Sequence, residues 1–104
     1  MANHHRGSVD LDLPSGRLTL CLTFGALAEI ETALGAGDLV ALGERLQTSR
    51  LSARDIIVIL GAAVRGGGQD LTDRTLAERL SAADAPAAVA AIGQLFAATF
   101  GDGS

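Results

Sequence analysis

The chain is poor in the residues from which catalytic and cofactor sites are most often built. Its 104 residues include no Trp, no Tyr and no Lys, and its single cysteine, Cys21, has no partner for an internal disulfide. We therefore exclude a disulfide framework and expect Cys21 to be a reduced, incidental thiol. The only histidines, His4 and His5, precede the first predicted strand, so neither is expected to join a buried catalytic triad.

Positive charge and long apolar runs are also scarce. The formal net charge is −4, and a mildly acidic chain is a poor generic binder of DNA or RNA, because nonspecific affinity comes from clustered cations. No uninterrupted apolar run approaches the roughly 18 residues of a membrane span, and Met1 to Gly7 lacks the apolar core of a signal peptide. We expect a cytoplasmic protein whose partners include neither nucleic acid nor a membrane.

Two acidic pairs and one glycine run invite chemical interpretations that their spacing does not favour. Asp10 and Asp12 share a face of a predicted strand, and the simplest interpretation is that this face is exposed to solvent. Glu29 and Glu31 fall on a predicted helix, about 200° apart, and cannot face one another. The glycines at 66–68 lack the Lys and Ser/Thr of a phosphate-binding loop and do not follow a strand. We therefore predict no catalytic residue, no cofactor and no enzymatic activity.

The N-terminal residues carry one narrower hypothesis about a metal. Removal of Met1 would leave the amino group of Ala2 with a histidine, His4, at the third position. That arrangement can wrap a square-planar Cu(II) or Ni(II) ion in nitrogen ligands. We interpret it as an accident of sequence and predict no metal site.

The beginning of the chain alternates with the period of a β-strand. Apolar side chains alternate with polar ones over residues 8–13 and again over residues 17–22, and Pro14, Ser15 and Gly16 between them are turn formers. The pattern predicts a β-hairpin. Because a lone two-stranded hairpin is marginal in water, its leucine face is expected to rest against helices.

The rest of the chain has helical periodicity. Ser52 and Asp55 resemble a capping box before the most apolar run, residues 56–60. This run could be a buried strand or the recognition helix of a helix-turn-helix, but the cap favours a helix, and aliphatic residues would stand where base-reading polar groups belong. We expect it to be the central helix. The predicted helices run from Thr23 to Gly35, from Asp38 to about residue 47, from Ser52 to Arg65, from Leu71 to Leu80, and from Asp84 to Phe100.

These elements predict one domain over residues 1–104, of the α+β class and mainly α, with an N-terminal β-hairpin packed on a small bundle of four to five helices. Residues 1–7 and 101–104 are expected to be flexible ends. Phe24 is placed with Leu27 on the helix face under the hairpin. The residues expected to be largely buried are Val9, Leu11, Leu20, Leu22, Leu27, Ile30, Ile56, Ile59, Leu60, Val64, Val89, Ile92 and Phe96.

Several segments form a distinctive set. They are ANHHRG at 2–7, the hairpin, TFGALAEIE at 23–31, Leu34-Gly35, DIIVIL at 55–60 and RGGG at 65–68. Together they resemble the gene transfer agent family of small tail proteins, and the resemblance runs over nearly the whole chain.

The resemblance implies a role in building a phage-like tail, as a tail assembly chaperone or as a tail tube protein. A tube subunit usually forms rings through a β-rich barrel, and this chain offers only two predicted strands. We therefore favour a chaperone that covers apolar helical segments of the tape-measure protein, with a structural tube or connector subunit as the alternative. The implied partners are the tape-measure protein or other tail components, with a homo-oligomer as a further option, and the implied location is the bacterial cytoplasm or the particle's tail.

Two aromatic residues near the C-terminus are candidates for partner binding. Phe96 and Phe100 supply two of the three aromatics, and aromatics often anchor interfaces. Their spacing of four residues also suits packing within the chain, so both interpretations stay open.

Overall fold

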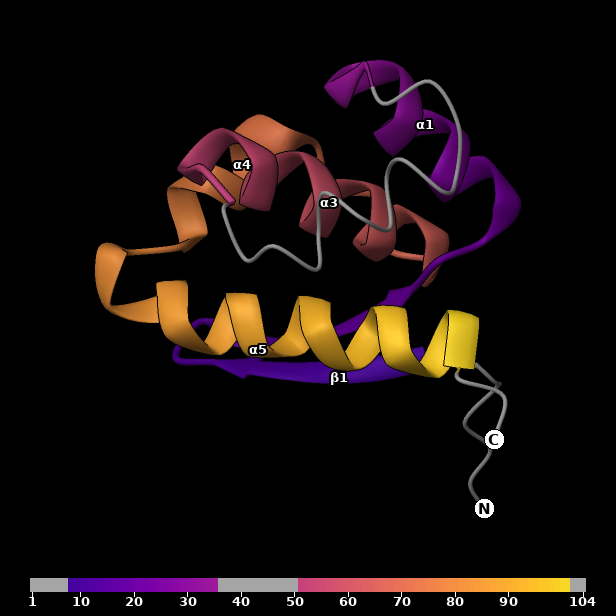
Figure 1. Ribbon diagram of the computed structural model, residues 1–104. Coiled ribbons are helices and arrows are strands. Elements are labelled where there is room, and N and C mark those ends of the chain that lie inside the picture. The colour runs from indigo at the N-terminus through magenta and orange to yellow at the C-terminus, as the bar shows by residue number, and fades with distance from the viewer. Residues whose placement is uncertain (1–7, 36–50, 102–104) are drawn as a thin grey trace.

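The computed structural model describes residues 8–35 and 51–101 (Figure 1). The helix predicted to begin at Asp38 and the expected flexible end at 1–7 lie outside these residues. Of the flexible end expected at 101–104, residues 102–104 also lie outside them, and Gly101 closes the last helical segment. The elements are β1 (Ser8–Leu13), β2 (Gly16–Cys21), α1 (Phe24–Leu34), α3 (Ala53–Gly66), α4 (Asp73–Arg79), a 3₁₀ turn (Ala82–Asp84), α5 (Ala85–Phe96) and a π-helical turn (Ala97–Gly101). The predicted α+β, mainly α class is confirmed.

The hairpin forms as its alternation predicts. β1 pairs antiparallel with β2, from Ser8 opposite Cys21 to Leu13 opposite Gly16. Gly16 has a φ of 137°, a backbone conformation that favours glycine, and this residue closes the turn. Alternate leucines are buried on the face that the helices cover, and α3 contacts β2 while α5 contacts β1.

The first helix begins and ends at the predicted residues, but its first aromatic does not face the core. The Thr23 Oγ1 accepts a hydrogen bond from the Ala26 N–H (3.0 Å), which caps α1. Leu27 is buried, whereas Phe24 is 82% exposed, so its predicted place under the hairpin was wrong. At about 100° per residue, Phe24 lies about 60° beyond Leu27, outside the arc from Ala26 to Leu27 that includes the buried Ile30.

The capping box and the central position of the third predicted helix are both confirmed. The Ser52 Oγ accepts from the Asp55 N–H (3.1 Å), and the Asp55 carboxylate accepts from the Ser52 N–H (3.2 Å). The helix α3 contacts α1, α4, α5 and β2, and Ile59 at its middle has no exposed surface. Burial on nearly every side therefore explains why the run at 56–60 is apolar throughout.

The last helix is rotated relative to the prediction. Its buried face consists of Ala88, Ala91, Ile92 and Leu95, whereas Val89 is 38% exposed. The face predicted to be buried, with Val89, Ile92 and Phe96, differs from the observed face by about one residue around the helix axis, roughly 100°. Small alanines on the inner face allow α5 to lie close along β1, as Figure 1 shows.

Most of the predicted core is confirmed. Val9 and Phe96 are only partly buried and pack against its edge, and with the exposed Val89 they are the three corrections. The ten residues that are buried as predicted are Leu11, Leu20, Leu22, Leu27, Ile30, Ile56, Ile59, Leu60, Val64 and Ile92.

The outer face of the C-terminal helix is unusually apolar. By length and composition alone, Ala82–Thr99 could cross a membrane, with a mean hydropathy of 1.2, although Asp84 and Gln94 interrupt the apolar run. Only 22% of this stretch is buried. Because its buried residues belong to the same core as the hairpin, we interpret it as a core helix whose outward side is made of small side chains.

Candidate partner-binding site

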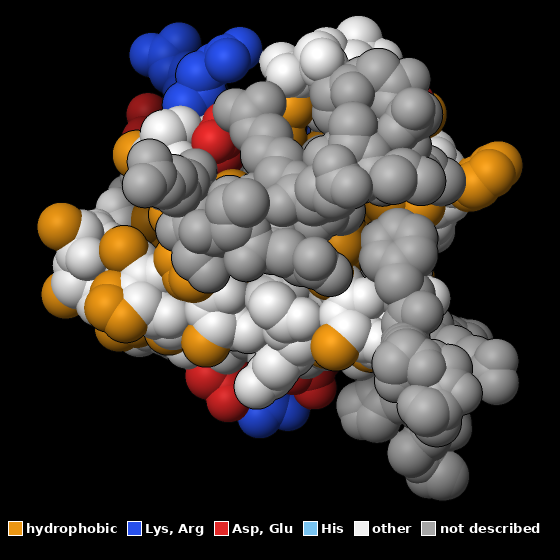
Figure 2. Space-filling model, in the orientation of Figure 1, with side chains coloured by type: hydrophobic (Ala, Val, Ile, Leu, Met, Phe, Trp, Pro, Cys, Tyr) orange, Lys and Arg blue, Asp and Glu red, His pale blue; other side chains and the backbone are white. Residues whose placement is uncertain are grey.

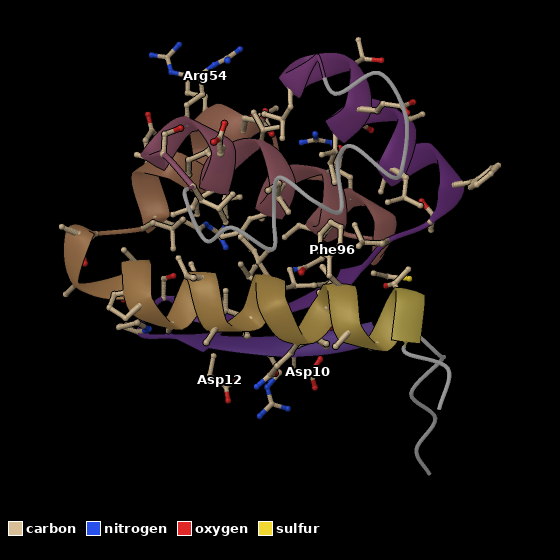
Figure 3. The ribbon with its side chains drawn as sticks, viewed as in Figure 1. Asp10, Asp12, Arg54 and Phe96 are labelled. Carbon is tan, nitrogen blue, oxygen red and sulfur yellow. The ribbon has the colours of Figure 1, made fainter. Side chains whose placement is uncertain are left out.

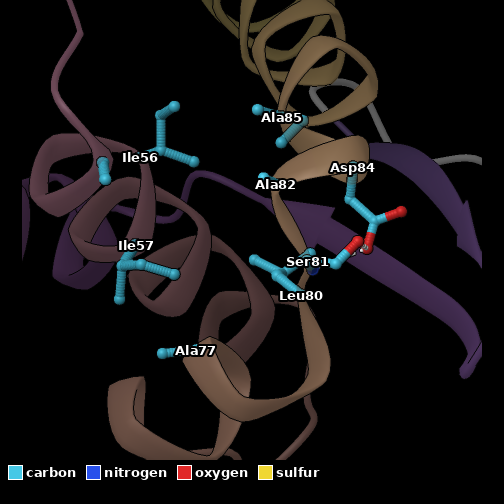
Figure 4. A pocket seen from close by; sticks show the side chains of 10 residues that line it. Ile56, Ile57, Ala77, Leu80, Ser81, Ala82, Asp84 and Ala85 are labelled. Atoms are coloured by element: carbon cyan, nitrogen blue, oxygen red, sulfur yellow. Dashed lines mark hydrogen bonds between the residues drawn. The ribbon is translucent and has the colours of Figure 1, made fainter.

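An apolar groove of about 290 Å³ lies between the start of α3, the end of α4 and the start of α5 (Figure 4). Ile56 and Ile57 stand on one side, and Leu80 stands opposite them. The residues that line the groove are Ala53, Ile56, Ile57, Ala77, Leu80, Ser81, Ala82, Asp84, Ala85 and Ala88.

Local hydrogen bonds order the start of α4 and the turn before α5. The Thr72 Oγ1 accepts from the Thr75 N–H (3.1 Å) and fixes the start of α4. The Asp84 carboxylate accepts from the Ser81 N–H (2.9 Å) and the Ser81 hydroxyl (3.3 Å), which orders the turn before α5. The alanines at 77, 82 and 85 are exposed and too short to fill the space between the helices.

The groove is suited to apolar side chains. Of the polar lining groups, the Ser81 N–H and hydroxyl both donate to the Asp84 Oδ2. Burying a polar or charged group of a partner here without a hydrogen-bond acceptor or donor would cost several kcal/mol. The lining therefore favours aliphatic contact over chemistry on a bound substrate.

Arg54 and Arg79 stand next to lining residues in the sequence, but neither lines the groove. Arg54 follows the lining residue Ala53 and Arg79 precedes Leu80, and both side chains are exposed. Neither makes a hydrogen bond or ion pair with another described residue. Figure 2 shows basic side chains gathered at the corner formed by α3 and α4, where Figure 3 labels Arg54.

Arg65 links α3 to α1 and to the start of α4. The Arg65 Nη1 donates to the Leu71 carbonyl oxygen (2.8 Å) and to Asp73 (3.0 Å), and its Nη2 donates to Glu29 (2.6 Å). The hydrogen bond to Glu29 is the main cause of a raised pKa for Arg65, against the lowering effect of partial burial. At Gly61, a β-carbon would overlap the Asp73 carboxylate, so glycine there lets Asp73 reach Arg65.

The acidic pair of the hairpin, Asp10 and Asp12, forms ion pairs with Arg17. The Arg17 Nε contacts Asp12 (2.6 Å) and its Nη1 contacts Asp10 (3.8 Å) on the exposed face of the sheet. Figure 3 shows Asp10 and Asp12 pointing away from the helices, on the solvent-exposed face of the hairpin, as predicted. The hydrogen bond to Asp12 is the main cause of a raised pKa for Arg17.

The predicted aromatic contacts are not at the groove. Phe96 is half-buried against the core at the end of α5 opposite the groove (Figure 3), and the Phe100 side chain lies outside the described side chains. Within the described residues, no group of three or more His, Cys, Asp or Glu could hold a metal ion. Cys21 is a half-buried free thiol in β2.

Sequence reasoning missed the groove. Its walls come from residues 53–57, 77–80 and 81–88, which no periodicity connects. The only local signal was the alanine-rich stretch after Leu80, where large side chains are missing from the start of a helix.

Comparison with known proteins identifies the family to which the chain belongs. Residues 6–102 match the family described as "Phage tail tube protein, GTA-gp10". The chain belongs to this family. The match confirms the resemblance to gene transfer agent tail proteins and supports a structural, tail-related role with other tail components as partners. No curated protein and no solved structure matches the chain.

Proposed function

We propose that this GTA-gp10 family member is a nonenzymatic tail assembly chaperone that covers an apolar helical segment of the tape-measure protein until the tail polymerises. The observation that carries the proposal is the apolar groove, which is open to solvent and lined by aliphatic side chains from three helices. Grooves of this kind receive the apolar face of an amphipathic helix.

The strand content also favours a chaperone. The described residues form a two-stranded sheet and four α-helices, whereas a tube ring usually requires sheets that continue between neighbouring subunits. In this role the chain would act in the host cytoplasm during assembly, without a membrane or nucleic acid. It would act as a monomer or a homo-oligomer, which light scattering would distinguish.

The family description supports a second candidate, a tube or connector subunit that stays in the finished particle. Quantitative mass spectrometry of purified particles separates the two. A chaperone is expected to be absent or strongly substoichiometric, whereas a structural subunit would be present in multiples that match the symmetry of the tail.

Capture of the tape-measure protein tests the chaperone directly. The tagged full chain, co-expressed with the tape-measure protein, is expected to purify with it and to keep it soluble. Abundant chain in mature particles together with no capture of the tape-measure protein would contradict the chaperone and favour the structural subunit.

A further inference from the structure

We infer that residues 66–69, which we call the edge cap, cover the outer edge of β2 and keep the β2 strand of a second copy of the chain from pairing with it. The described strands form a two-stranded sheet, and an uncovered sheet edge is a template for pairing with another chain. The inference goes beyond the proposed function, because it concerns self-association of this chain, and its experiments use no other tail component.

Backbone contacts show which residues of β2 face this edge. The Thr19 N–H donates to the Gln69 side-chain oxygen (3.3 Å), and the Thr19 carbonyl oxygen lies against Gly67. The Cys21 carbonyl oxygen lies against Gly66 in the same way. In an antiparallel pair, residues whose N–H and C=O bind the partner strand alternate with residues whose groups point away from it. Thr19 and Cys21 therefore present to the edge cap the groups that an added strand would bind.

The sequence of the edge cap explains how it reaches this edge. A β-carbon on Gly66 or Gly67 would overlap a carbonyl oxygen of β2, so glycine at both positions allows the close approach. Gly68 has a φ of 101°, a conformation that favours glycine, and the Gln69 N–H donates back to a carbonyl oxygen of α3 (3.2 Å). This turn places the Gln69 side-chain oxygen where the carbonyl oxygen of a neighbouring strand would accept the Thr19 N–H.

The side chains of β2 would allow pairing with a second copy. Antiparallel pairing of two β2 strands about Thr19 would place the two Thr19 residues opposite each other and Arg17 opposite Cys21 of the second copy. Arg17 is the one charged residue of β2, so no like charges would stand directly opposite each other. The side chains of β2 thus do not prevent self-pairing, and the protection of this edge depends on the edge cap.

The other edge of the sheet is protected by charge. Asp10 lies opposite Thr19 and Asp12 lies opposite Arg17, so both aspartates direct their backbone groups away from β2. Pairing of two β1 strands about Asp10 would set two carboxylates directly opposite each other, which is destabilising. Charged residues on an edge strand are a common protection against association. Pairing of β1 with the β2 strand of a second copy would also require the edge that the edge cap covers.

Removing the edge cap is expected to make the full chain associate. The uncapped variant Gly67→Ala/Gln69→Ala displaces the cap from the Thr19 carbonyl oxygen and removes the acceptor of the Thr19 N–H. Sedimentation velocity is expected to show its mass doubling at a concentration at least about tenfold lower than that of the wild type. An uncapped variant that is folded by circular dichroism and associates no more than the wild type would overturn the inference.

A matched control separates the edge cap from the chemistry of the substitutions. Gly93→Ala/Gln94→Ala makes the same two changes at exposed residues of α5, where a β-carbon on Gly93 meets nothing within 4 Å. This control is expected to shift the concentration of half-association by less than about twofold. Equal shifts in the control and in the uncapped variant would contradict a specific role of residues 66–69.

A cross-link locates the contact between the two copies. In the uncapped variant with Cys21→Ser, the further change Thr19→Cys would set two thiols opposite each other, with Cα atoms about 5.5 Å apart, within the range of a disulfide. A covalent dimer is expected on a non-reducing gel. Ala90→Cys in the same background, at an exposed residue of α5, is expected to give none. Equal cross-linking at the two positions would overturn the proposed pairing of β2 strands.

A milder variant decides the matter if the uncapped variant fails to fold. Gln69→Ala alone keeps the glycines and removes one hydrogen bond, so the edge cap is expected to open about threefold more often. Because only the open form can pair, the concentration of half-association is expected to fall by at least about threefold. No fall in this folded variant would overturn the inference.

Discussion

Gly66, at the C-terminal end of α3, lies so close to the carbonyl oxygen of Cys21 in β2 that a β-carbon on residue 66 would overlap that oxygen. The next residue, Gly67, has the same relationship with the carbonyl oxygen of Thr19. The Thr19 N–H in turn donates to the Gln69 side-chain oxygen (3.3 Å). The glycine run thus brings the end of the central helix directly against the outer edge of β2, which is a structural role for one of the segments that carry the family resemblance.

Gly66→Ala is therefore expected to destabilise the protein. The obstructing atom belongs to the backbone of β2 and cannot rotate away, so α3 or β2 must move, at a cost of about 1–3 kcal/mol in the free energy of unfolding. Gly93→Ala is the control, because a β-carbon on Gly93 in α5 meets nothing within 4 Å. Alanine there is expected to gain about 0.5–1 kcal/mol. Urea unfolding measures both, and equal effects would contradict the close contact.

The two ends of one predicted helix face are expected to respond differently to truncation. Phe24→Ser should change the free energy of unfolding by less than about 0.5 kcal/mol, because the Phe24 side chain is exposed. Leu27→Ala should cost about 2–5 kcal/mol, because Leu27 is buried in the core. Thermal melting followed by circular dichroism compares the two variants. A large loss of stability in the Phe24 variant would mean that the Phe24 side chain is buried in the core.

Arg65 is expected to stabilise the junction of α1, α3 and α4. Arg65→Met removes hydrogen bonds to two carboxylates and one carbonyl oxygen and should cost about 1–2 kcal/mol, less than for a fully buried network because these groups are partly exposed. Arg74→Met is the control, since the Arg74–Glu78 pair is 3.7 Å apart and exposed, and it should cost less than about 0.5 kcal/mol.

The raised pKa of Arg65 also predicts how its contribution depends on pH. A base whose pKa is higher in the folded state contributes fully below its unfolded pKa and loses that contribution only as the pH rises through the folded value. Both values lie far above neutrality, so deprotonation of Arg65 should not change stability between about pH 6 and pH 9. Unfolding free energies of the wild type and Arg65→Met, measured across this range, should stay separated by a constant amount.

Features set by short-range interactions could be predicted from the sequence. The hairpin follows from alternation and a turn, and the caps at Thr23 and Ser52 follow from side chains that bond to the backbone three residues later. The rotation of α5 could not be predicted, because Ala88 and Val89 are both apolar and only the close approach to β1 decides which is buried. The groove likewise depends on how three helices meet and not on any one of them.

The central helix can be tested with a buried charge. Ile59 has no exposed surface, so Ile59→Asp would bury an unpaired carboxylate and is expected to unfold a domain of this size. Ala90→Asp, on the exposed side of α5, should leave the fold intact. Unchanged circular dichroism and melting in the Ile59 variant would mean that this helix is not central.

The last prediction concerns how far the partner surface extends along α5. Phe96 is half-buried against the core, so Phe96→Ala is expected to lower the melting temperature and to report mainly on folding. Phe100, four residues further on, is the better probe of binding, because truncation at a helix end should cost less stability than at a central position. We expect Phe100→Ala to melt within a few degrees of the wild type and to bind a helical tape-measure segment more weakly, since aromatic residues often anchor interfaces. Calorimetric titration with that segment measures the change. Unchanged affinity in a folded Phe100 variant would remove this end of the helix from the proposed contact surface.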